Sequence, residues 1–427
     1  TKFHSGAGYQ YEDSVIYGFT HTNKGHWNLC HIPLLPVTGT PTPGDYCSPF
    51  SHERESAAPG YYQVFLDRYG VDAQLSSTLR CAFHKYTYPA GAAASLLADL
   101  QRSNEHVRAW DIRKEGDNVF AGWQQTGEKM YFYAVANRPV TGIEPVVEGD
   151  REVRIVRFGE GDGALELRIG FSFVSEENAR KNLEAEMLGR SFADVRSEAT
   201  AVWNDLLGRI RVEGGTEREK GLFYSCLYRS FLWPALRSDV NGEYMGADFR
   251  VHRSRSKQYT SFSNWDTYRT QIQLLSMLAP DVASDVVLSH QHFAEQSGGA
   301  FPRWVMANIE TGIMQGDPTP ILIANAWAFG AQDYDPFPLF QIMRRNAEVP
   351  GAKSQDVEER PGLKQYLEKG YYNASEQLEY TSSDFAIGQF ALHACGDEFA
   401  SWRYFHYARS WKNLYNPQTG WLQSRNA

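Results

Sequence analysis

The sequence predicts a multidomain β plus α protein, in which an amino-terminal β-sandwich is followed by linker helices and an all-α domain. The chain has 427 residues, which is more than one ordinary hydrophobic core holds. Apolar residues alternate through the first 175 residues and recur with helical spacing afterwards. Because strands and helices do not alternate along the chain, a Rossmann or TIM-barrel architecture is disfavoured. We place the β-sandwich at 1–175, the linker helices at 176–215 and the helical domain at 216–427.

The β-sandwich prediction rests on short strands separated by Gly, Pro and Asp. Odd positions are apolar throughout 165–173, and the same alternation occurs at 71–75. The denser apolar run at 129–135 is typical of a central strand. These segments predict strands that bury one face each.

Helical spacing begins after Ser175, a good N-cap with Glu176 and Glu177 in the first turn behind it. An apolar stripe then recurs at three- and four-residue intervals, at Phe192, Val195, Ala199, Val202 and Leu206. Further helices are predicted at 220–233, 267–278, 283–296, 321–329 and 382–395, and prolines end the first two.

Composition narrows the functional class. A net charge of −9 argues against a nucleic-acid partner, because phosphates require a basic face. No apolar run reaches the length of about 18 residues that a membrane span needs, and no signal peptide is visible at the start. Aromatic residues make up 14% of the chain, and sugar-binding clefts use such residues to pack against pyranose rings.

The stretch 261–271 places Trp265, Asp266 and Arg269 at the start of a predicted helix, where their spacing puts them on one face. An ordinary account is a helix-end aspartate, a surface ion pair and a core tryptophan. The alternative is a sugar site, with an indole against the ring and charged groups on its hydroxyls. From spacing alone both accounts stay open.

A second cluster of the same character lies at 298–318. Its glycines and aromatic residues are followed by carboxylates, and it contains Arg303, Trp304, Asn308, Glu310 and Asp317. Two such clusters between helices favour a cleft at one end of a helical barrel.

Several segments, taken together in order and spacing, resemble the bacterial exo-acting α-mannosidases of glycoside hydrolase family 92. They are found at 58–64, 83–89, 238–244, 264–269, 299–304, 308–311, 378–380 and 411–417. The resemblance implies a β-sandwich packed on a six-hairpin α/α toroid barrel. It also implies a Ca²⁺-dependent, inverting exo-α-mannosidase. Such an enzyme releases terminal mannose from mannose-rich, N-glycan-type oligosaccharides, here with α-1,2 linkage. The implied location is secreted, periplasmic or at the cell surface.

The resemblance also implies which residues bind the substrate. Trp265 and Asp266 match a pair that lies in the pocket for the terminal mannose, and Trp27 is the counterpart of a tryptophan from a sandwich loop. Arg303 and Asp317 are looser matches near the same pocket. With Arg269, Trp304 and Glu310 they complete the expected substrate-binding set. The segment 20–28 departs from the family pattern, with Asn23 in place of a second histidine, in a loop that in the family shapes the side where the leaving sugar sits.

The ends of the sequence lack other segments of the family. The general acid lies in a Glu-Gly-Asn segment and the base in an Asn-Asp-Asp segment, and neither occurs here. We therefore expect a fragment with a truncated sandwich and an incomplete barrel, which is inactive alone and lacks most of the calcium ligands. In such a barrel the apolar face of Ile387, Phe390 and Ala391 is expected to be partly exposed.

Two other functional classes remain as alternatives. One is another α/α-barrel glycosidase or a phosphorylase, although no cluster of basic residues suggests a phosphate pocket. The other is a non-catalytic mannose-binding module.

Overall fold

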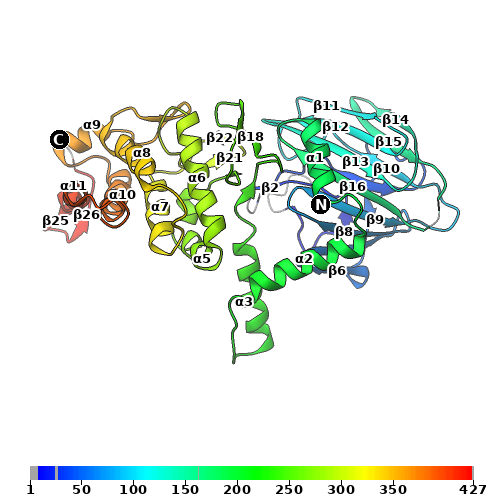
Figure 1. Cartoon of the computed structure of the whole chain (residues 1–427), viewed down its shortest axis with the longest axis horizontal. Coiled ribbons are helices and arrows are strands. Elements are labelled where there is room, and N and C mark those ends of the chain that lie inside the picture. The colour runs from blue at the N-terminus through cyan, green and yellow to red at the C-terminus, as the bar shows by residue number, and fades with distance from the viewer. Residues whose placement is uncertain (1–7, 25–26, 162, 426–427) are drawn as a thin grey trace. The chain divides into compact units, whose positions relative to one another are not determined.

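The computed structural model describes residues 8–24, 27–161 and 163–425. The chain divides into two compact units, Thr1–Tyr244 and Met245–Ala427, which are described separately below. The first unit holds two large β-sheets and three helices, and the second is mainly helical (Figure 1).

The first unit is a β-sandwich. Within its described residues, one antiparallel sheet has eight strands in the order β11–β12–β13–β16–β9–β8–β7–β6, and the other has four in the order β14–β15–β10–β4. The strands are β4 (Leu34–Val37), β6 (Glu55–Ala58), β7 (Tyr61–Leu66), β8 (Val71–Ser77), β9 (Cys81–Thr87), β10 (Ser95–Ala98), β11 (Ala109–Lys114), β12 (Val119–Gln125), β13 (Lys129–Ala136), β14 (Val140–Glu148), β15 (Arg151–Phe158) and β16 (Leu165–Ser172).

The alternation of apolar and polar residues in the sequence matches an alternation of buried and more exposed side chains along the strands. Leu165, Leu167 and Ile169 of β16 all point into the core and have no exposed surface. Along β13, buried and half-buried residues also alternate without a break. The predicted strands at 71–75, 129–135 and 165–173 are therefore confirmed.

Three helices follow the sandwich, namely α1 (Glu176–Glu186), α2 (Phe192–Leu207) and α3 (Glu217–Ser230). Ser175 caps α1 as predicted, because its hydroxyl accepts a hydrogen bond from the Asn178 N–H at 3.1 Å. Helix α1 packs directly on β16, where Gly170 allows the close approach. A Cβ atom at that glycine would lie 2.1 Å from the Ala179 carbonyl oxygen.

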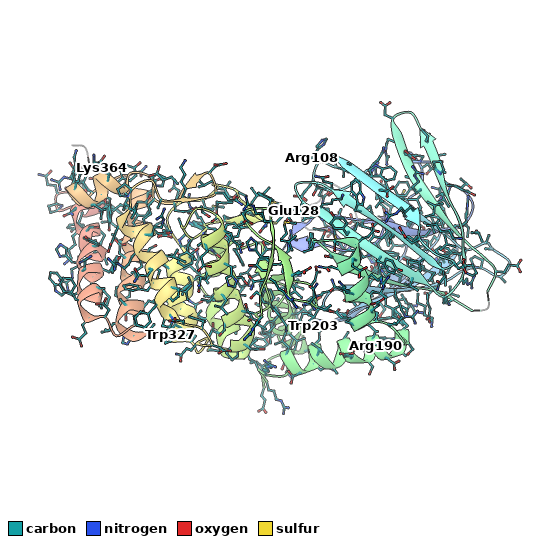
Figure 2. All side chains as sticks on the ribbon, turned by 45° about the horizontal axis from the view of Figure 1, so that its top comes forward. Arg108, Glu128, Arg190, Trp203, Trp327 and Lys364 are labelled. Carbon is teal, nitrogen blue, oxygen red and sulfur yellow. The ribbon has the colours of Figure 1, made fainter. Side chains whose placement is uncertain are left out.

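The second unit consists mainly of packed helices. They are α4 (Asn264–Thr267), α5 (Gln271–Leu278), α6 (Pro280–Gln296), α7 (Thr319–Ala328), α8 (Pro336–Glu348), α9 (Leu363–Lys369), α10 (Ala374–His393), α11 (Glu398–Ala408) and the 3₁₀ helix η2 (Arg409–Leu414). Helix α10 packs against α7, α8 and α11. Figure 2 labels Trp327 of α7, whose ring meets the ring of Phe390 on α10 at a centroid distance of 6.0 Å.

Short elements complete the chain. They are β1 (Val15–Ile16), β2 (Asn23–Lys24), β3 (Trp27–Asn28), β5 (Ser48–Pro49), η1 (His52–Arg54), β17 (Ala235–Leu236), β18 (Glu243–Met245), β19 (Val251–Arg253), β20 (Tyr259–Thr260), β21 (Val305–Met306), β22 (Ile309–Glu310), β23 (Lys353–Ser354), β24 (Val357–Glu358), β25 (Tyr415–Asn416) and β26 (Trp421–Leu422).

Two helix predictions differ from the structure. The single helix expected at 267–278 is broken into α4 and α5, because the φ of Thr270, −151°, lies outside the helical region. Helix α10 begins eight residues before the predicted start at 382, and the Asn373 side chain caps it by accepting from the Ser375 N–H. Its first turns are rich in polar residues and carry no clear apolar stripe.

The expected exposure of the α10 apolar face is wrong. Ile387 and Ala391 have no exposed surface and Phe390 is 1% exposed, because α7 and α11 cover them. Phe385, on another side of α10, is 52% exposed instead. The six-hairpin arrangement of the helices and the predicted domain boundaries stay predictions.

None of the helices in the described part of the chain combines the length and the apolar character that crossing a bilayer requires.

Candidate functional site

A short β-bridge joins the two clusters that the sequence singled out. Ser263, the residue before α4, pairs antiparallel with Trp304, and the Val305 N–H donates to the Phe262 carbonyl at 2.9 Å. The Trp304 indole Nε1–H then donates to Asp266 Oδ2 at 3.0 Å. Trp304 is buried whereas Asp266 is exposed, so the indole holds a carboxylate that solvent and ligands can reach.

Arg269 lies beyond the end of α4, in the turn before α5. Its guanidinium carbon is 4.6 Å from the centroid of the Trp265 ring and 4.8 Å from that of Tyr268. Such cation–π contacts hold an arginine in place while leaving its N–H groups able to donate. The ion pair considered between Asp266 and Arg269 does not form among the described residues, because the helix ends before Arg269. The Trp265 Nε1–H is buried and has no hydrogen-bond partner among the residues that the structure describes.

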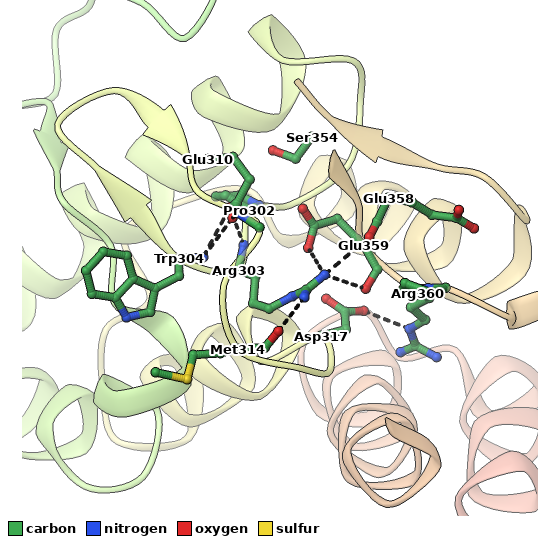
Figure 3. A network of polar contacts seen from close by, with 12 residues as sticks. Pro302, Arg303, Trp304, Glu310, Met314, Asp317, Ser354, Glu358, Glu359 and Arg360 are labelled. Atoms are coloured by element: carbon green, nitrogen blue, oxygen red, sulfur yellow. Dashed lines mark hydrogen bonds and ion pairs between the residues drawn. The ribbon is translucent and has the colours of Figure 1, made fainter. Parts of the chain in front are cut away.

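Glu310 holds the turn that carries Trp304. Its carboxylate accepts hydrogen bonds from the backbone N–H groups of Arg303 at 2.7 Å, Trp304 at 3.1 Å and Gly312 at 3.0 Å (Figure 3). Burial raises the pKa of Glu310, and the three backbone donors act in the opposite direction. Glu310 therefore fixes the backbone from which the indole of Trp304 reaches Asp266.

Arg303 ties this turn to the segment 358–360. Its guanidinium donates to the Met314 carbonyl at 2.7 Å and to the carbonyls of Glu358 and Glu359 at 3.2 Å each (Figure 3). It also lies 3.5 Å from the Glu359 carboxylate. Arg303 is 5% exposed, so these contacts form inside the protein.

Asp317 belongs to a fully buried ionic network. The guanidinium of Arg360 donates to Asp317 at 2.9 Å and to Asp384 of α10 at 2.8 Å. The Asn346 amide also donates to Asp317, and the Tyr366 hydroxyl donates to Asp384 at 2.7 Å. This network connects the loop after Trp304 to α8, α9 and α10.

Glu359 provides a prediction about pH and stability. It has no exposed surface, and burial, with Glu310 nearby, raises the pKa of Glu359 well above its ordinary value of 4.5. The unfolded chain loses this proton near pH 4.5 whereas the folded chain keeps it, so stability falls as the pH rises above 4.5. Glu359→Gln cannot ionise. Its stability relative to the wild type should therefore increase with pH, by at most about 1.4 kcal/mol per pH unit.

Urea unfolding of both proteins at pH 5 and at pH 8 measures this difference. Glu368→Gln is the control, because Glu368 is exposed on α9. A Glu359→Gln difference that is the same at both pH values would contradict the prediction.

The structure places the predicted site residues in two groups. Trp265, Asp266, Arg269 and Trp304 come together through the bridge. Arg303, Glu310 and Asp317 are buried and have hydrogen-bond or ion-pair partners within the protein, so they stabilise the loops of the site. Direct contact between any of them and a substrate stays a prediction. Trp27 lies in β3 of the first unit, but its side chain is outside the described residues, so its place in the pocket also stays a prediction.

Sequence reasoning missed Glu359, Arg360, Asp384 and Tyr366. The Glu358-Glu359-Arg360 run has the appearance of a solvated surface segment, and no local pattern indicates that two of its members are buried. Asp384 lies in the middle of a helix, and an aspartate that is buried there needs a charged or hydrogen-bonding partner. This aspartate could therefore have indicated the buried network.

Two features of the described residues bear on ligands. A groove of about 1160 Å³ is lined by aromatic side chains that include Trp327, Phe385, Phe405 and Trp411, and Tyr268, next to Arg269, also lines it.

No three His, Cys, Asp or Glu residues in the described ranges are arranged to hold a metal ion, so none of them is assigned as a ligand of the expected Ca²⁺.

Comparison with models of known protein families shows the family to which the chain belongs. The model of the glycosyl hydrolase family 92 catalytic domain matches residues 178–427, and that of the family 92 N-terminal domain matches residues 1–180. The chain belongs to glycosyl hydrolase family 92. The resemblance noted from the sequence is thereby confirmed.

Solved structures of the family share the fold. A family GH92 alpha-mannosidase from Bacteroides thetaiotaomicron has a TM-score of 0.89 at 24% identity, covering 100% of this chain and 62% of that one. A family GH92 inverting mannosidase from the same organism has a TM-score of 0.88 at 26% identity, covering 100% of this chain and 61% of that one. These likenesses confirm the predicted fold class, a β-sandwich followed by a helical domain.

A curated relative is an uncharacterized secreted glycosidase from Arthroderma benhamiae. It is 23% identical over 98% of this chain and 58% of its own length. The chain thus spans about three fifths of the length of the relatives that it matches.

Proposed function

We propose that this chain forms the mannose-binding part of a secreted exo-α-mannosidase. The observation that carries the proposal is the exposed Asp266 carboxylate, held by the Trp304 indole beside Trp265 and Arg269, in a chain of family 92. The names of the related proteins support it. They include an alpha-mannosidase, whose structure was also solved in complex with mannoimidazole, an inverting mannosidase and a secreted glycosidase.

The chemistry of the site suits a sugar. An ionised carboxylate accepts hydrogen bonds from hydroxyl groups more strongly than a neutral acceptor does, and an arginine donates back to hydroxyl oxygens. Indole faces pack against the C–H face of a pyranose. Because Trp304 fixes Asp266 in advance, little conformational entropy is lost when a ligand binds.

The finer part of the proposal concerns substrate and reaction. The substrates are mannose-terminated glycans of the N-glycan type, with an α-1,2 linkage, and the hydrolysis inverts the anomeric centre and depends on Ca²⁺. This part is supported by the sequence resemblance, and the departure at 20–28 concerns the side where the leaving sugar sits.

The test uses the active protein that contains this chain. It is incubated with an aryl α-mannoside and an aryl α-glucoside, with and without a calcium chelator, and NMR identifies the first anomer released. Release of β-mannose, blocked by the chelator and restored by calcium, is expected. Equal rates on the glucoside would favour another glycosidase, a requirement for phosphate would favour a phosphorylase, and binding without turnover would favour a non-catalytic module.

Residues 1–427 alone are expected not to hydrolyse mannosides. Inversion needs an acid and a base with carboxyl groups roughly 6.5–9.5 Å apart. The carboxylates of Glu310, Asp317 and Asp384 are taken by backbone donors or by Arg360, and Glu359 is fully buried. Mannose release by the purified 427-residue chain, at rates near those of a longer relative, would contradict this prediction.

A further inference from the structure

The short helix α4, which carries Trp265 and Asp266, needs support from the rest of the helical unit. It is a single turn of four residues, and the chain leaves the helical conformation again at Thr270. An isolated turn of this length is unstable, because few hydrogen bonds offset the cost of ordering it. The direction in which the turn presents Asp266 therefore depends on contacts with other elements.

The turn has a buried side and an open side. Asn264 has no exposed surface and Thr267 is 3% exposed, whereas Asp266 is exposed. The Asn264 side chain thus carries an amide into the interior from the position just before Trp265 and Asp266. Burial of an amide is unfavourable unless its nitrogen and oxygen form hydrogen bonds, so the partners of this amide fix how the turn lies.

The Asn264 amide contacts three other segments of the helical unit. Its nitrogen Nδ2 donates to the Pro302 carbonyl at 3.1 Å and to Thr319 Oγ1, at the start of α7, at 2.6 Å. The Thr319 hydroxyl donates in turn to the same Pro302 carbonyl. The amide oxygen lies 3.0 Å from Nε2 of His290 on α6. Asn264 therefore ties α4 to α6, to α7 and to the loop at Pro302.

His290 orients the amide from the other side. It has no exposed surface, and its ring stacks on the ring of Phe262 with the centroids 3.9 Å apart. Its second nitrogen, Nδ1, lies 2.8 Å from the Val286 carbonyl oxygen, so the ring cannot turn without losing a contact. The amide cannot flip either, because a flipped Asn264 would set its oxygen against the Pro302 carbonyl.

The contact with Pro302 bears on the site because Pro302 lies two residues before Trp304. The hydrogen bond from Trp304 Nε1–H to Asp266 Oδ2 measures 3.0 Å, and the Asn264 amide holds the backbone close to both of its partners. Misplacing a binding group by about 1 Å can remove most of its effect on a ligand. A buried contact that fixes both the carboxylate and the indole beside it is therefore expected to affect ligand binding.

We propose that Asn264 is a positioning residue of the sugar site, which sets the placement of Asp266 while His290 and Thr319 hold the amide of Asn264. Asn264 acts through Asp266 and does not contact the sugar, since its side chain has no exposed surface. This assignment rests on the proposed function. It makes the affinity for a mannose-like ligand depend on a buried, uncharged amide as well as on the groups that face the ligand.

Gln377 offers a matched control in the same unit. It is also an amide without exposed surface, and it uses the same groups. Its nitrogen Nε2 donates to the carbonyls of Gly370 at 3.2 Å and Ser410 at 2.9 Å, and its oxygen accepts from the Tyr372 N–H at 2.7 Å. Gln377→Leu therefore removes a comparable set of hydrogen bonds from an equally buried position, but none of these contacts involves α4.

The experiment measures the Kd of mannoimidazole by calorimetry in the active protein that contains this chain. Asn264→Leu, which replaces the amide by an apolar group of similar size, is expected to weaken binding by about 10-fold or more. Gln377→Leu is expected to bind as the wild type does. Both variants should lose stability in urea, because both leave buried partners unpaired, so a loss of stability alone does not produce the expected difference in affinity.

A double-mutant cycle tests whether Asn264 acts through Asp266. In the wild-type background Asp266→Asn is expected to lose about 10-fold in affinity for mannoimidazole. In the Asn264→Leu background the same change should lose less than about 3-fold, because a carboxylate that is already misplaced contributes little. A residue that only supports the fold would leave the effect of Asp266→Asn the same in both backgrounds.

The outcomes separate the two proposals. A wild-type protein that binds no mannoimidazole, or that binds it no better than Asp266→Asn does, removes the proposed function. If the wild type binds it and Asp266→Asn is weaker, three results overturn the role of Asn264 alone: wild-type affinity in Asn264→Leu, an equal loss in Gln377→Leu, or an Asp266→Asn effect of the same size in both backgrounds. Circular dichroism establishes that each variant is folded. Thr319→Val, which keeps the shape of the side chain and removes only its hydroxyl, replaces Asn264→Leu if that variant does not fold.

Discussion

Replacing Arg360 with methionine is expected to destabilise the helical unit by about 3–5 kcal/mol, the usual cost of removing one partner from a buried ionic network. Methionine fills a similar volume but leaves Asp317 and Asp384 facing each other without a cation, and both carboxylates are buried. Because Arg360 also joins the loop at 317 to α10, the loss should spread to the turn that carries Trp304. Urea unfolding followed by circular dichroism measures the change.

The control is Arg180→Met on α1, which removes an exposed pair with Glu184. Exposed pairs of this kind contribute little, so no measurable change in stability is expected there. A loss below about 1 kcal/mol in Arg360→Met, similar to that of an exposed pair, would show that the buried network is not needed for stability.

Replacing Asp266 with alanine should cost about 2–4 kcal/mol of transition-state stabilisation. This loss lowers kcat/KM on an aryl α-mannoside by roughly 30- to 1000-fold. The variant removes the charged acceptor for the sugar hydroxyls and leaves the buried Trp304 Nε1–H without its partner. The fold should survive, because Asp266 is exposed and the Glu310 contacts hold the turn.

The comparison for this prediction is Asp281→Asn, an exposed aspartate in the first turn of α6, which should keep wild-type kinetics. If the Asp266→Ala protein is folded and retains the wild-type kcat/KM, the carboxylate does not contact the substrate. The pocket would then have to be sought elsewhere, for example along the aromatic groove lined by Trp327 and Phe385.

Much of the fold could be predicted from local patterns. The alternation at 165–173 identified β16, and the Ser175 cap identified the start of α1, because burial and capping leave direct traces in the sequence. The break between α4 and α5 could not be predicted in this way, since no Gly or Pro marks Thr270. The break is also a point of tertiary contact, where the Asn325 amide of α7 donates to the Tyr268 carbonyl at 3.2 Å.

The candidate site was only partly predictable for a related reason. The two clusters were visible, but their connection runs through the bridge between Ser263 and Trp304, residues that are far apart in the sequence. Arg360 and Glu359 look like surface charges, but both are buried, Arg360 against Asp317 and Asp384 and Glu359 beside Arg303.

The measurement that tests the account most directly is the binding of mannoimidazole to the active protein containing this chain, compared between the wild type and Asp266→Asn. Asparagine keeps the shape of the side chain and removes its charge. The wild type is expected to bind mannoimidazole more tightly than the gluco-configured imidazole. Asp266→Asn is expected to lose about 10-fold or more in affinity for mannoimidazole, because a charge-assisted hydrogen bond is replaced by a neutral one. Equal affinity in the two proteins, or no preference for the manno configuration in the wild type, would contradict it.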